Sequence, residues 1–317
     1  MKKHSMICAG IDTGKRKLDV ALNGQAERLQ VANADAGYRE LIAWLRRHRV
    51  KRVGIEASGG YEQAVVNRLR RDGFLVIVFQ PLQVRAYARF HLQRAKNDRI
   101  DAALIAGCAA EAKKIHAPPD PRLAALAAQQ TLIDQIVDQM ARFKNYREAC
   151  RDAPLRQFWN DEIKRFRGLF KRELKQLVTA IRRHPDLAER LELIASVDGI
   201  ALRTATAILV RLPEIGSVSR EQAAALAGVA PYDDESSDRI GERHIAGGRE
   251  RLRKNIYGAA LAASFHWNAE LIELYQRLTA AGKDHKVALI ACSRKLLVFA
   301  NAVVARGTPW QPRTAVH

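Results

Sequence analysis

The order of secondary-structure signals in the first eighty residues restricts the fold more than any other feature of the chain. Three short strand patterns come first, over residues 5–11, 17–23 and 26–33. The dipeptide Asn23-Gly24, between the second and third patterns, is typical of a β-hairpin. A helix, a strand, a second helix and a strand then follow, up to residue 79. This order predicts an α/β domain with a mixed sheet flanked by helices.

The rest of the chain is predicted to be helical. Residues 120–190 contain a single glycine, and apolar residues such as Leu132, Ile136 and Met140 recur at helical spacing. This segment forms either a hairpin packed on its own domain or a coiled-coil-like arm for oligomerisation. Residues 191–317 follow as a mostly α-helical domain, and residues 1–119 precede both. The stretch "SVDGIALRTATAIL" in the last domain resembles a helix-hairpin-helix motif, whose turn amides can face a phosphate.

The net charge indicates the kind of partner. The chain carries 53 Lys and Arg against 34 Asp and Glu, a formal charge of +19. Such an excess favours binding to polyanions but carries no sequence specificity. Nucleic acid is the expected partner. An anionic membrane surface is the weaker alternative, because the chain has no basic amphipathic helix with a clean apolar face.

Cysteine usage and hydrophobic runs indicate the compartment. The four cysteines are far apart and form no CxxC pair, which argues against a zinc site or a disulfide framework. Asp12 interrupts the first apolar stretch, which is too short for a secretion signal. Charged residues interrupt the late apolar run 286–305, which is therefore expected to be a buried helix. We expect a cytoplasmic, nucleoid-associated protein without a membrane span.

Four acidic residues are candidates for a metal site. Asp12 ends the first strand pattern, Glu56 ends a later one, and Asp98 and Asp101 are three apart, on one face of a helix. If the two strands are neighbours and the helix crosses their ends, the four carboxylates converge. Neighbouring carboxylates are unfavourable unless cations neutralise them, and oxygen ligands favour Mg²⁺, with Mn²⁺ as an alternative. Two such ions support phosphodiester cleavage.

Each acid also has a simpler interpretation. Asp12 fits a strand-end turn, Glu56 could pair with an arginine, and Asp98 could cap its helix. Asp19, in the middle of a strand pattern, is expected at the surface.

Three motifs taken together carry a family resemblance. "GIDTGKRKLDVAL", "GIEASGGYEQAVVNRL" and "AKNDRIDAALIA" resemble the DEDD domain of the insertion sequence 110 family of transposases and the related Piv-type DNA invertases. The C-terminal stretches "AALAGVAP" and "GERHIAGGRERLRKNIYGAAL" resemble the second domain of that family. The resemblance implies an RNase H-like (RuvC-like) fold with Asp12, Glu56, Asp98 and Asp101 as metal ligands. It also implies a bridge RNA that pairs with donor and target DNA.

The resemblance also implies a serine nucleophile. In the family it lies in an Asp-Ser-Gly segment shortly after a "GLAP" motif, and this chain has Glu235-Ser236-Ser237 there. Ser236 is therefore the candidate, and Ser237 is the alternative by one register step. Without the resemblance, both serines would be solvated loop residues.

A basic segment follows the serines. It is expected to contact the phosphate backbone, and the alternative is a solvated helix turn. Its candidate nucleic-acid-binding residues are Gly247, Gly248, Arg249, Arg251, Arg253 and Lys254.

These observations favour a DNA transposase or recombinase that acts on element ends and target DNA with Mg²⁺, as a homodimer or homotetramer. The alternatives are a Piv-like invertase, a hydrolytic RuvC-like junction nuclease and a non-catalytic nucleic-acid-binding protein.

Overall fold

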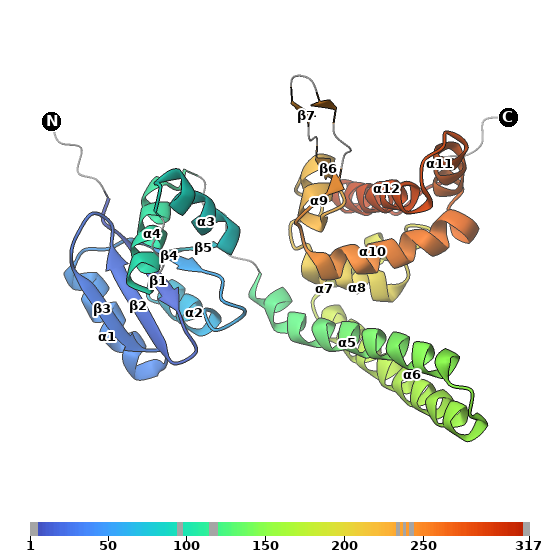
Figure 1. The fold of residues 1–317 in the computed structure, drawn as a ribbon, viewed down its shortest axis with the longest axis horizontal. Helices are drawn as coiled ribbons and strands as arrows, with labels where there is room; N and C mark the ends of the chain where they lie inside the picture. The colour runs from blue at the N-terminus through green and yellow to red at the C-terminus, as the bar shows by residue number, and fades with distance from the viewer. Residues whose placement is uncertain are drawn as a thin grey trace. The chain divides into compact units, whose positions relative to one another are not determined.

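The computed structural model describes residues 6–93, 98–113, 120–232, 235–236, 239–240 and 244–312. The chain divides into two compact units, Met1–Pro118 and Pro119–His317. Figure 1 shows a sheet with helices in the first unit and an almost entirely helical second unit.

The N-terminal unit is built on one five-stranded mixed sheet. Its strands are β1 (Cys8–Thr13), β2 (Lys17–Leu22), β3 (Arg28–Ala32), β4 (Arg52–Glu56) and β5 (Leu75–Phe79). They lie in the order β3-β2-β1-β4-β5; β1, β2 and β3 are antiparallel neighbours, and β4 and β5 run parallel to β1. This topology is that of an RNase H-like domain, and it confirms the predicted fold class.

Helices cover both faces of this sheet (Figure 1). They are α1 (Asp35–Arg47), α2 (Gln63–Arg71), α3 (Pro81–Phe90) and α4 (Asp98–Glu111). On one face, α1 and α2 bury Leu41 and Leu69 against Ile11 of β1. On the other face, α3 and α4 pack against Cys8 and Phe79. Helix α3 was not predicted, although Pro81 stands at its first turn, where proline is favoured.

Helix α4 approaches the sheet at two glycines that face each other in neighbouring strands. Gly10 of β1 pairs with Gly54 of β4. A Cβ atom at Gly10 would lie 2.1 Å from the carbonyl oxygen of Ala102, and one at Gly54 would lie 2.8 Å from that of Ile105. Such distances are far below contact, so the helix backbone occupies the space that side chains would need. The two glycines therefore allow α4 to pack this close to the sheet.

We predict that Gly10→Ala destabilises the N-terminal unit by about 1–3 kcal/mol or more, because the added methyl group displaces α4. Hydrogen exchange of the α4 amides in the full chain measures this. Gly168→Ala is the matched control, since a Cβ there meets nothing within 4 Å. In the middle of a helix it should stabilise by about 0.5–1 kcal/mol. Unchanged α4 protection in Gly10→Ala would contradict the role given to this contact.

The C-terminal unit consists of helices and two short strand pairs. Its helices are α5 (Pro121–Ala149), α6 (Ala153–Arg182), α7 (Pro185–Ala195), α8 (Leu202–Arg211), α9 (Arg220–Ala227), α10 (Glu250–Ala262), the π-helix η1 (Ala263–Trp267), α11 (Ala269–Ala280) and α12 (His285–Arg306). The strand pairs are β6 (Pro231–Tyr232) with β9 (His244–Ile245), and β7 (Glu235–Ser236) with β8 (Arg239–Ile240). This agrees with the predicted mostly helical domain.

The two longest helices, α5 and α6, form a hairpin (Figure 1). Its two ends differ in burial. At its base, Ile133 and Leu177 are fully buried in the same core as Leu191 of α7 and Leu296 of α12. Towards the turn at residues 150–152, most side chains are exposed. The base is therefore part of the C-terminal core, and the far half is an arm.

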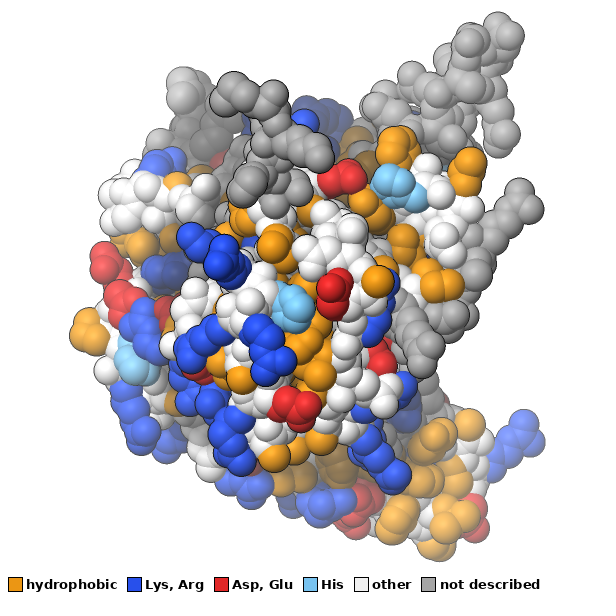
Figure 2. All heavy atoms as spheres, turned by 90° about the vertical axis from the view of Figure 1, so that its left-hand side faces the viewer, with side chains coloured by type: hydrophobic (Ala, Val, Ile, Leu, Met, Phe, Trp, Pro, Cys, Tyr) orange, Lys and Arg blue, Asp and Glu red, His pale blue; other side chains and the backbone are white. Residues whose placement is uncertain are grey.

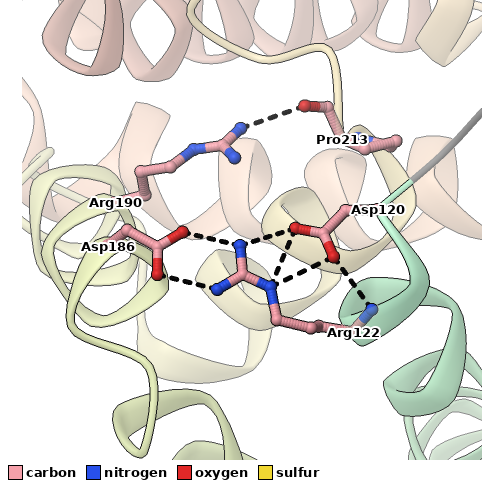
Figure 3. Close-up of polar contacts among 5 residues, drawn as sticks. All are labelled: Asp120, Arg122, Asp186, Arg190 and Pro213. Carbon is pink, nitrogen blue, oxygen red and sulfur yellow. Dashed lines mark hydrogen bonds and ion pairs between the residues drawn. The ribbon is translucent and has the colours of Figure 1, made fainter. Parts of the chain in front are cut away.

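An arginine holds the base of the hairpin against α7 (Figure 3). Arg122 Nη2 donates to Asp120 at 2.7 Å and to Asp186 at 2.7 Å. These hydrogen bonds lower the pKa of both carboxyls below the ordinary value. Nearby, Arg190 Nη2 donates to the carbonyl oxygen of Pro213 at 3.0 Å. The Arg122–Asp186 bond therefore joins the first turn of α5 to that of α7, and the Arg190 bond joins α7 to the segment after α8.

Helix α12 contains the late apolar run. By length and composition it could cross a membrane, and half of its most apolar window is buried within the unit. Its residues Leu289, Cys292, Leu296 and Ala300 are fully buried among the other helices. Helix α12 is thus a central helix of this core.

Candidate functional site

The strand register places two of the predicted acids on the same face of the sheet. Side chains two residues apart in a strand point to the same side. Asp12 is two residues beyond Gly10, and Glu56 is two residues beyond Gly54. Because both glycines lie under α4, both acids emerge on the α4 face, at the ends of neighbouring parallel strands. Each is half-buried.

The direction of α4 brings its first turn to the same edge of the sheet. Arg52, at the start of β4, donates through Nη1 to the carbonyl oxygen of Ala109 at 2.9 Å. The last turns of α4 therefore lie where β4 begins, and the first turn, with Asp98 and Asp101, lies towards the ends of β1 and β4. Asp101 is half-buried and adjoins Ala102, whose carbonyl lies over Gly10.

The side chain of Asp98 lies outside the described part of the chain. Among the side chains that are described, no three His, Cys, Asp or Glu form a group that could hold a metal ion. The meeting of all four carboxylates thus stays a prediction, supported by the backbone positions of their elements.

Asp19 is a fifth acid on this face, and its predicted surface position is wrong. It is directly opposite Asp12 in the β1–β2 register and is only 8% exposed. Its carboxylate accepts a hydrogen bond from Gln30 Nε2 at 2.6 Å and pairs with Lys17 Nζ at 3.0 Å. Buried carboxylates require such partners, and here the neighbouring strand and the start of β2 supply them. The apolar residues around Asp19 in "KLDVAL" were the available signal.

The side chain of Glu62, which the sequence did not indicate as a functional residue, holds the loop after Glu56 in its conformation. Glu62 Oε2 accepts hydrogen bonds from the amides of Ser58 at 3.0 Å and Gly60 at 2.9 Å, and from the Ser58 hydroxyl at 3.0 Å. Burial pushes the pKa of Glu62 upward, but these hydrogen bonds outweigh it and hold the pKa below its ordinary value. Glu62 therefore fixes the backbone that leads away from Glu56.

We predict that the stabilising effect of the Glu62 charge depends on pH. Because the folded pKa is depressed, the contribution is complete above the unfolded value of about 4.3 and is lost as pH falls through the folded value. The difference in unfolding free energy between wild type and Glu62→Gln should be constant near neutrality and shrink below about pH 4. Chemical denaturation across pH measures it, with the exposed Glu40→Gln as control. A difference that grows on acidification would contradict this assignment.

Cysteine chemistry does not contribute to this site. Burial raises the pKa of Cys108 in α4 to about 11, and Glu111 and Glu56 add to the shift. Burial also raises the pKa of Cys8 and of Cys292. These thiols are therefore protonated at neutral pH and are poor nucleophiles.

In the C-terminal unit, the predicted serine lies in the short strand β7. The register pairs Ser236 with Arg239 of β8. The side chain of Ser236 and all of Ser237 lie outside the described residues, so the choice between them stays a prediction.

The predicted phosphate-binding segment begins at a tight turn. Gly247 and Gly248 have φ of 62° and 68°, and a Cβ at Gly248 would lie 2.2 Å from the amide nitrogen of Gly228. Arg249 forms two hydrogen bonds with the carboxylate of Glu214, at 2.6 and 2.8 Å. Arg253 Nη1 donates to the carbonyl oxygen of Gly247 at 2.7 Å. These two arginines hold the turn itself.

The remaining cations of the segment are placed differently. Arg251 is half-buried, and Lys254 is exposed and makes a 3.6 Å ion pair with Glu250 one turn earlier in α10. A single exposed ion pair of this kind is weak. Lys254 can therefore leave Glu250 and pair with a phosphate instead at little cost in free energy.

Positive charge also covers the N-terminal unit. Figure 2 views the molecule from the side of this unit and shows many Lys and Arg with fewer acidic side chains. The exposed basic residues of α1, α2 and the segments that follow them are Arg39, Arg46, Arg47, Arg49, Lys51 and Arg71. Such a surface favours polyanions.

Comparison with known proteins identifies the class of protein as a transposase. Residues 9–150 match a family described as "Transposase", the DEDD type of IS110, and residues 191–276 match "Transposase IS116/IS110/IS902 family". The chain therefore belongs to the IS110 family of transposases, and it is a DNA recombinase or transposase.

Two curated relatives match nearly the whole chain. The pilin gene-inverting proteins of Moraxella bovis and Moraxella lacunata are each 26% identical over 314 residues, covering 96% of this chain and 97% of the relative. Among solved structures, Thermus thermophilus RuvC in complex with a Holliday junction substrate is 19% identical, covers 32% of this chain and 90% of its own, and gives a TM-score of 0.27.

Proposed function

We propose that this enzyme cuts and exchanges DNA strands at the ends of a mobile element and at its target, with Asp12, Glu56, Asp98, Asp101 and Ser236 as catalytic residues. The observation that supports it best is the paired register of Gly10 and Gly54 beneath α4. Asp12 and Glu56 follow these glycines by two residues, which supports a shared face, and the hydrogen bond from Arg52 to Ala109 supports a first turn of α4 that lies towards them.

The donor set fits a hard divalent cation. The four acids offer only carboxylate oxygens, which suit Mg²⁺ or Mn²⁺. Asp12, Glu56, Asp98 and Asp101 would hold the metal, which when bound activates an attacking oxygen and stabilises a leaving one. Glu62 keeps the strand end that carries Glu56 in place through the Ser58 and Gly60 amides.

The role of the serine is to store the energy of the broken bond. Ser236 Oγ loses its proton and bonds to phosphorus while one phosphorus–oxygen bond to a sugar breaks, and the leaving sugar oxygen gains a proton. A sugar hydroxyl of another strand then attacks the phosphoserine and releases the serine. Strand exchange by this route needs no ATP.

Two variants of this chemistry are distinguishable. A Piv-like invertase is favoured by the match to pilin gene-inverting proteins over 96% of the chain; it would use the same residues on a different arrangement of DNA. A hydrolytic nuclease would use the four acids and water and would not need Ser236.

We predict that Asp101→Asn lowers DNA cleavage at least about 100-fold while DNA binding persists, because a ligand and a charge are lost together. EDTA should abolish cleavage by the wild type. Asp35→Asn, in the first turn of α1, is the matched control for the acid.

Ser236→Ala should abolish the covalent protein–DNA complex detected on labelled DNA by denaturing electrophoresis. Ser237→Ala decides the register: it should keep the covalent complex if Ser236 is the nucleophile, and loss of the complex in Ser237→Ala alone would assign the nucleophile to Ser237. Cleavage at the wild-type rate by Ser236→Ala would support the hydrolytic nuclease, and normal exchange by Asp101→Asn would refute the metal site.

The proposed partners are DNA, a noncoding bridge RNA and further copies of the chain. The net charge of +19 supports binding of both nucleic acids. The arm of the hairpin supports self-association. Phe143 packs against Trp159 and Phe166 there, with ring centroids 5.5 and 5.1 Å apart, yet Phe158 and Tyr146 beside them are 53% and 49% exposed. Exposed aromatic residues in a cluster are typical of an interface.

We predict that the purified protein carries RNA of discrete length and forms a dimer or tetramer. Sequencing of the co-purified nucleic acid and light scattering measure the two properties. Phe158→Ser combined with Tyr146→Ser should reduce the mass to that of a monomer, because the apolar contact is lost. A wild-type monomer with and without nucleic acid would contradict self-association, and nucleic acid of random sequence would contradict the guide RNA.

A further inference from the structure

A pocket of about 590 Å³ lies within the C-terminal unit, and none of the proposed catalytic residues lines it. One wall is the turn between α7 and α8, residues 196–201, and the other is the small-residue face of α10. Trp267, the last residue of η1, lies at its rim. A volume of this size is typical of sites for small organic groups.

The turn and η1 are held against each other by a glycine and an asparagine. Gly199 has φ of 94°, and a Cβ there would lie 2.3 Å from that of Ala263. Asn268 Nδ2 donates to the carbonyl oxygen of Asp198 at 3.1 Å. Trp267 is therefore fixed beside the turn by contacts on both sides of η1. π-Helical turns of this kind occur frequently at functional sites.

Two polar side chains that line the pocket have atoms without a hydrogen-bond partner. Asn255 is 4% exposed; its Nδ2 donates to Asp134 Oδ1 at 3.0 Å and to the carbonyl oxygen of Arg251 at 2.9 Å, but its Oδ1 has no partner. Arg203 Nε is buried and also unpaired. Buried polar atoms are normally satisfied, so these two atoms indicate a missing ligand or solvent.

Arg203 also carries an uncompensated charge. Among the residues that the structure describes, its guanidinium forms no ion pair, whereas Arg211 on the same helix pairs with Asp134 at 2.6 Å. Burial lowers the pKa of Arg203, and the more distant Asp134 and Asp138 only partly oppose this. A half-buried, unpaired guanidinium in a pocket calls for an anion, and its planar fork suits a phosphate.

The start of α8 adds donors at the same wall. Its N-cap is Ala201, which offers no side-chain acceptor. The amides of Thr204 and Ala205 both donate to the carbonyl oxygen of Ala201. Within the described chain, the amides of Leu202 and Arg203 have no acceptor, and the helix dipole favours an anion there.

Trp267 offers an apolar plane beside these donors. It is 68% exposed, and Phe265 in the same π-helical segment is 44% exposed. Large exposed aromatic side chains next to a cation are typical of surfaces on which unpaired bases stack. In a duplex, each base face is already covered by its neighbours, so a paired base cannot use such a plane.

We propose that this pocket receives one unpaired nucleotide of the nucleic acid on which the enzyme acts. The phosphate binds to Arg203 and the first amides of α8, the base stacks on Trp267, and Asn255 Oδ1 accepts a hydrogen bond from the base. This rests on the proposed function and deepens it, since strand exchange and RNA guidance both create unpaired nucleotides. DNA and RNA share this chemistry.

The experiment measures the affinity of the full-length protein, freed of bound nucleic acid, by fluorescence anisotropy. The probes are labelled single strands of DNA and of RNA and a DNA duplex of the same sequence. Trp267→Ala should weaken binding of at least one single strand roughly 5- to 100-fold and of the duplex less than about twofold, and Trp267→Phe should restore most of the affinity. If the DNA single strand loses affinity, the nucleotide belongs to DNA; if the RNA single strand loses affinity, it belongs to RNA.

Arg203→Gln tests the phosphate position. It should weaken the same single strand and reduce the slope of log K against log salt by about one. Phe90→Ala, a 79% exposed aromatic in α3, and Arg220→Gln, an exposed arginine in α9, are the matched controls and should bind as wild type. Because Trp267 is largely exposed, its replacement leaves the fold intact, which circular dichroism verifies.

Two results would overturn the proposal. One is single-strand binding by Trp267→Ala and Arg203→Gln within about twofold of wild type, and the other is an equal loss for single strand and duplex. Neither result bears on the proposed metal site, because metal-dependent cleavage could persist in either case. Conversely, if Asp101→Asn still exchanged strands but Trp267→Ala lost single-strand affinity, the pocket would stand and the proposed chemistry would fall.

Discussion

The packing of α4 directly on Gly10 and Gly54 is the constraint on which the rest of the N-terminal unit depends. Any side chain at these positions would overlap the helix backbone. Its Cβ would lie only 2.1 Å (at Gly10) or 2.8 Å (at Gly54) from a carbonyl oxygen of α4. The same two strands carry Asp12 and Glu56 two residues further on, so the contact that fixes the helix also fixes which face the acids occupy. The position of Asp101 depends on the same contact, because the carbonyl oxygen of the next residue, Ala102, lies over Gly10. Packing and site geometry thus have one origin.

The order of strands and helices was predictable because the apolar patterns and the Asn23-Gly24 turn are local signals. The acids at the strand ends were predictable as candidates for the same reason. Asp19 was misplaced because its apolar neighbours, the one local signal of burial, say nothing of the partner that makes burial of a carboxylate possible, Gln30 in another strand. Helix α3 was missed although Pro81 marked its start. Arg249 and Arg253 show a related limit, since their partners Glu214 and Gly247 become neighbours only when the turn closes.

A buried polar network centred on Asp134 joins helices of the C-terminal unit. Asp134 of α5 accepts hydrogen bonds from Arg211 at 2.6 Å and from Asn255 at 3.0 Å, which ties the hairpin to α8 and α10. Removing one partner of such a buried pair is costly, so the network specifies how these helices meet. Asn255 and Arg203 both line the pocket, and each has one buried polar atom, Oδ1 and Nε respectively, without a hydrogen-bond partner. The base of the hairpin, the core and the pocket are therefore connected through one set of side chains.

The most direct test of the central claim is to map the metal site by cleavage of the polypeptide itself. Fe²⁺ substituted for Mg²⁺ generates hydroxyl radicals with peroxide and ascorbate, and these cut the backbone nearest the ion. The account predicts cuts near residues 12, 56 and 98–101, suppressed by excess Mg²⁺ and by Asp12→Asn. Cuts confined to one of these segments, or located elsewhere in the chain, would show that the acids do not share a cation.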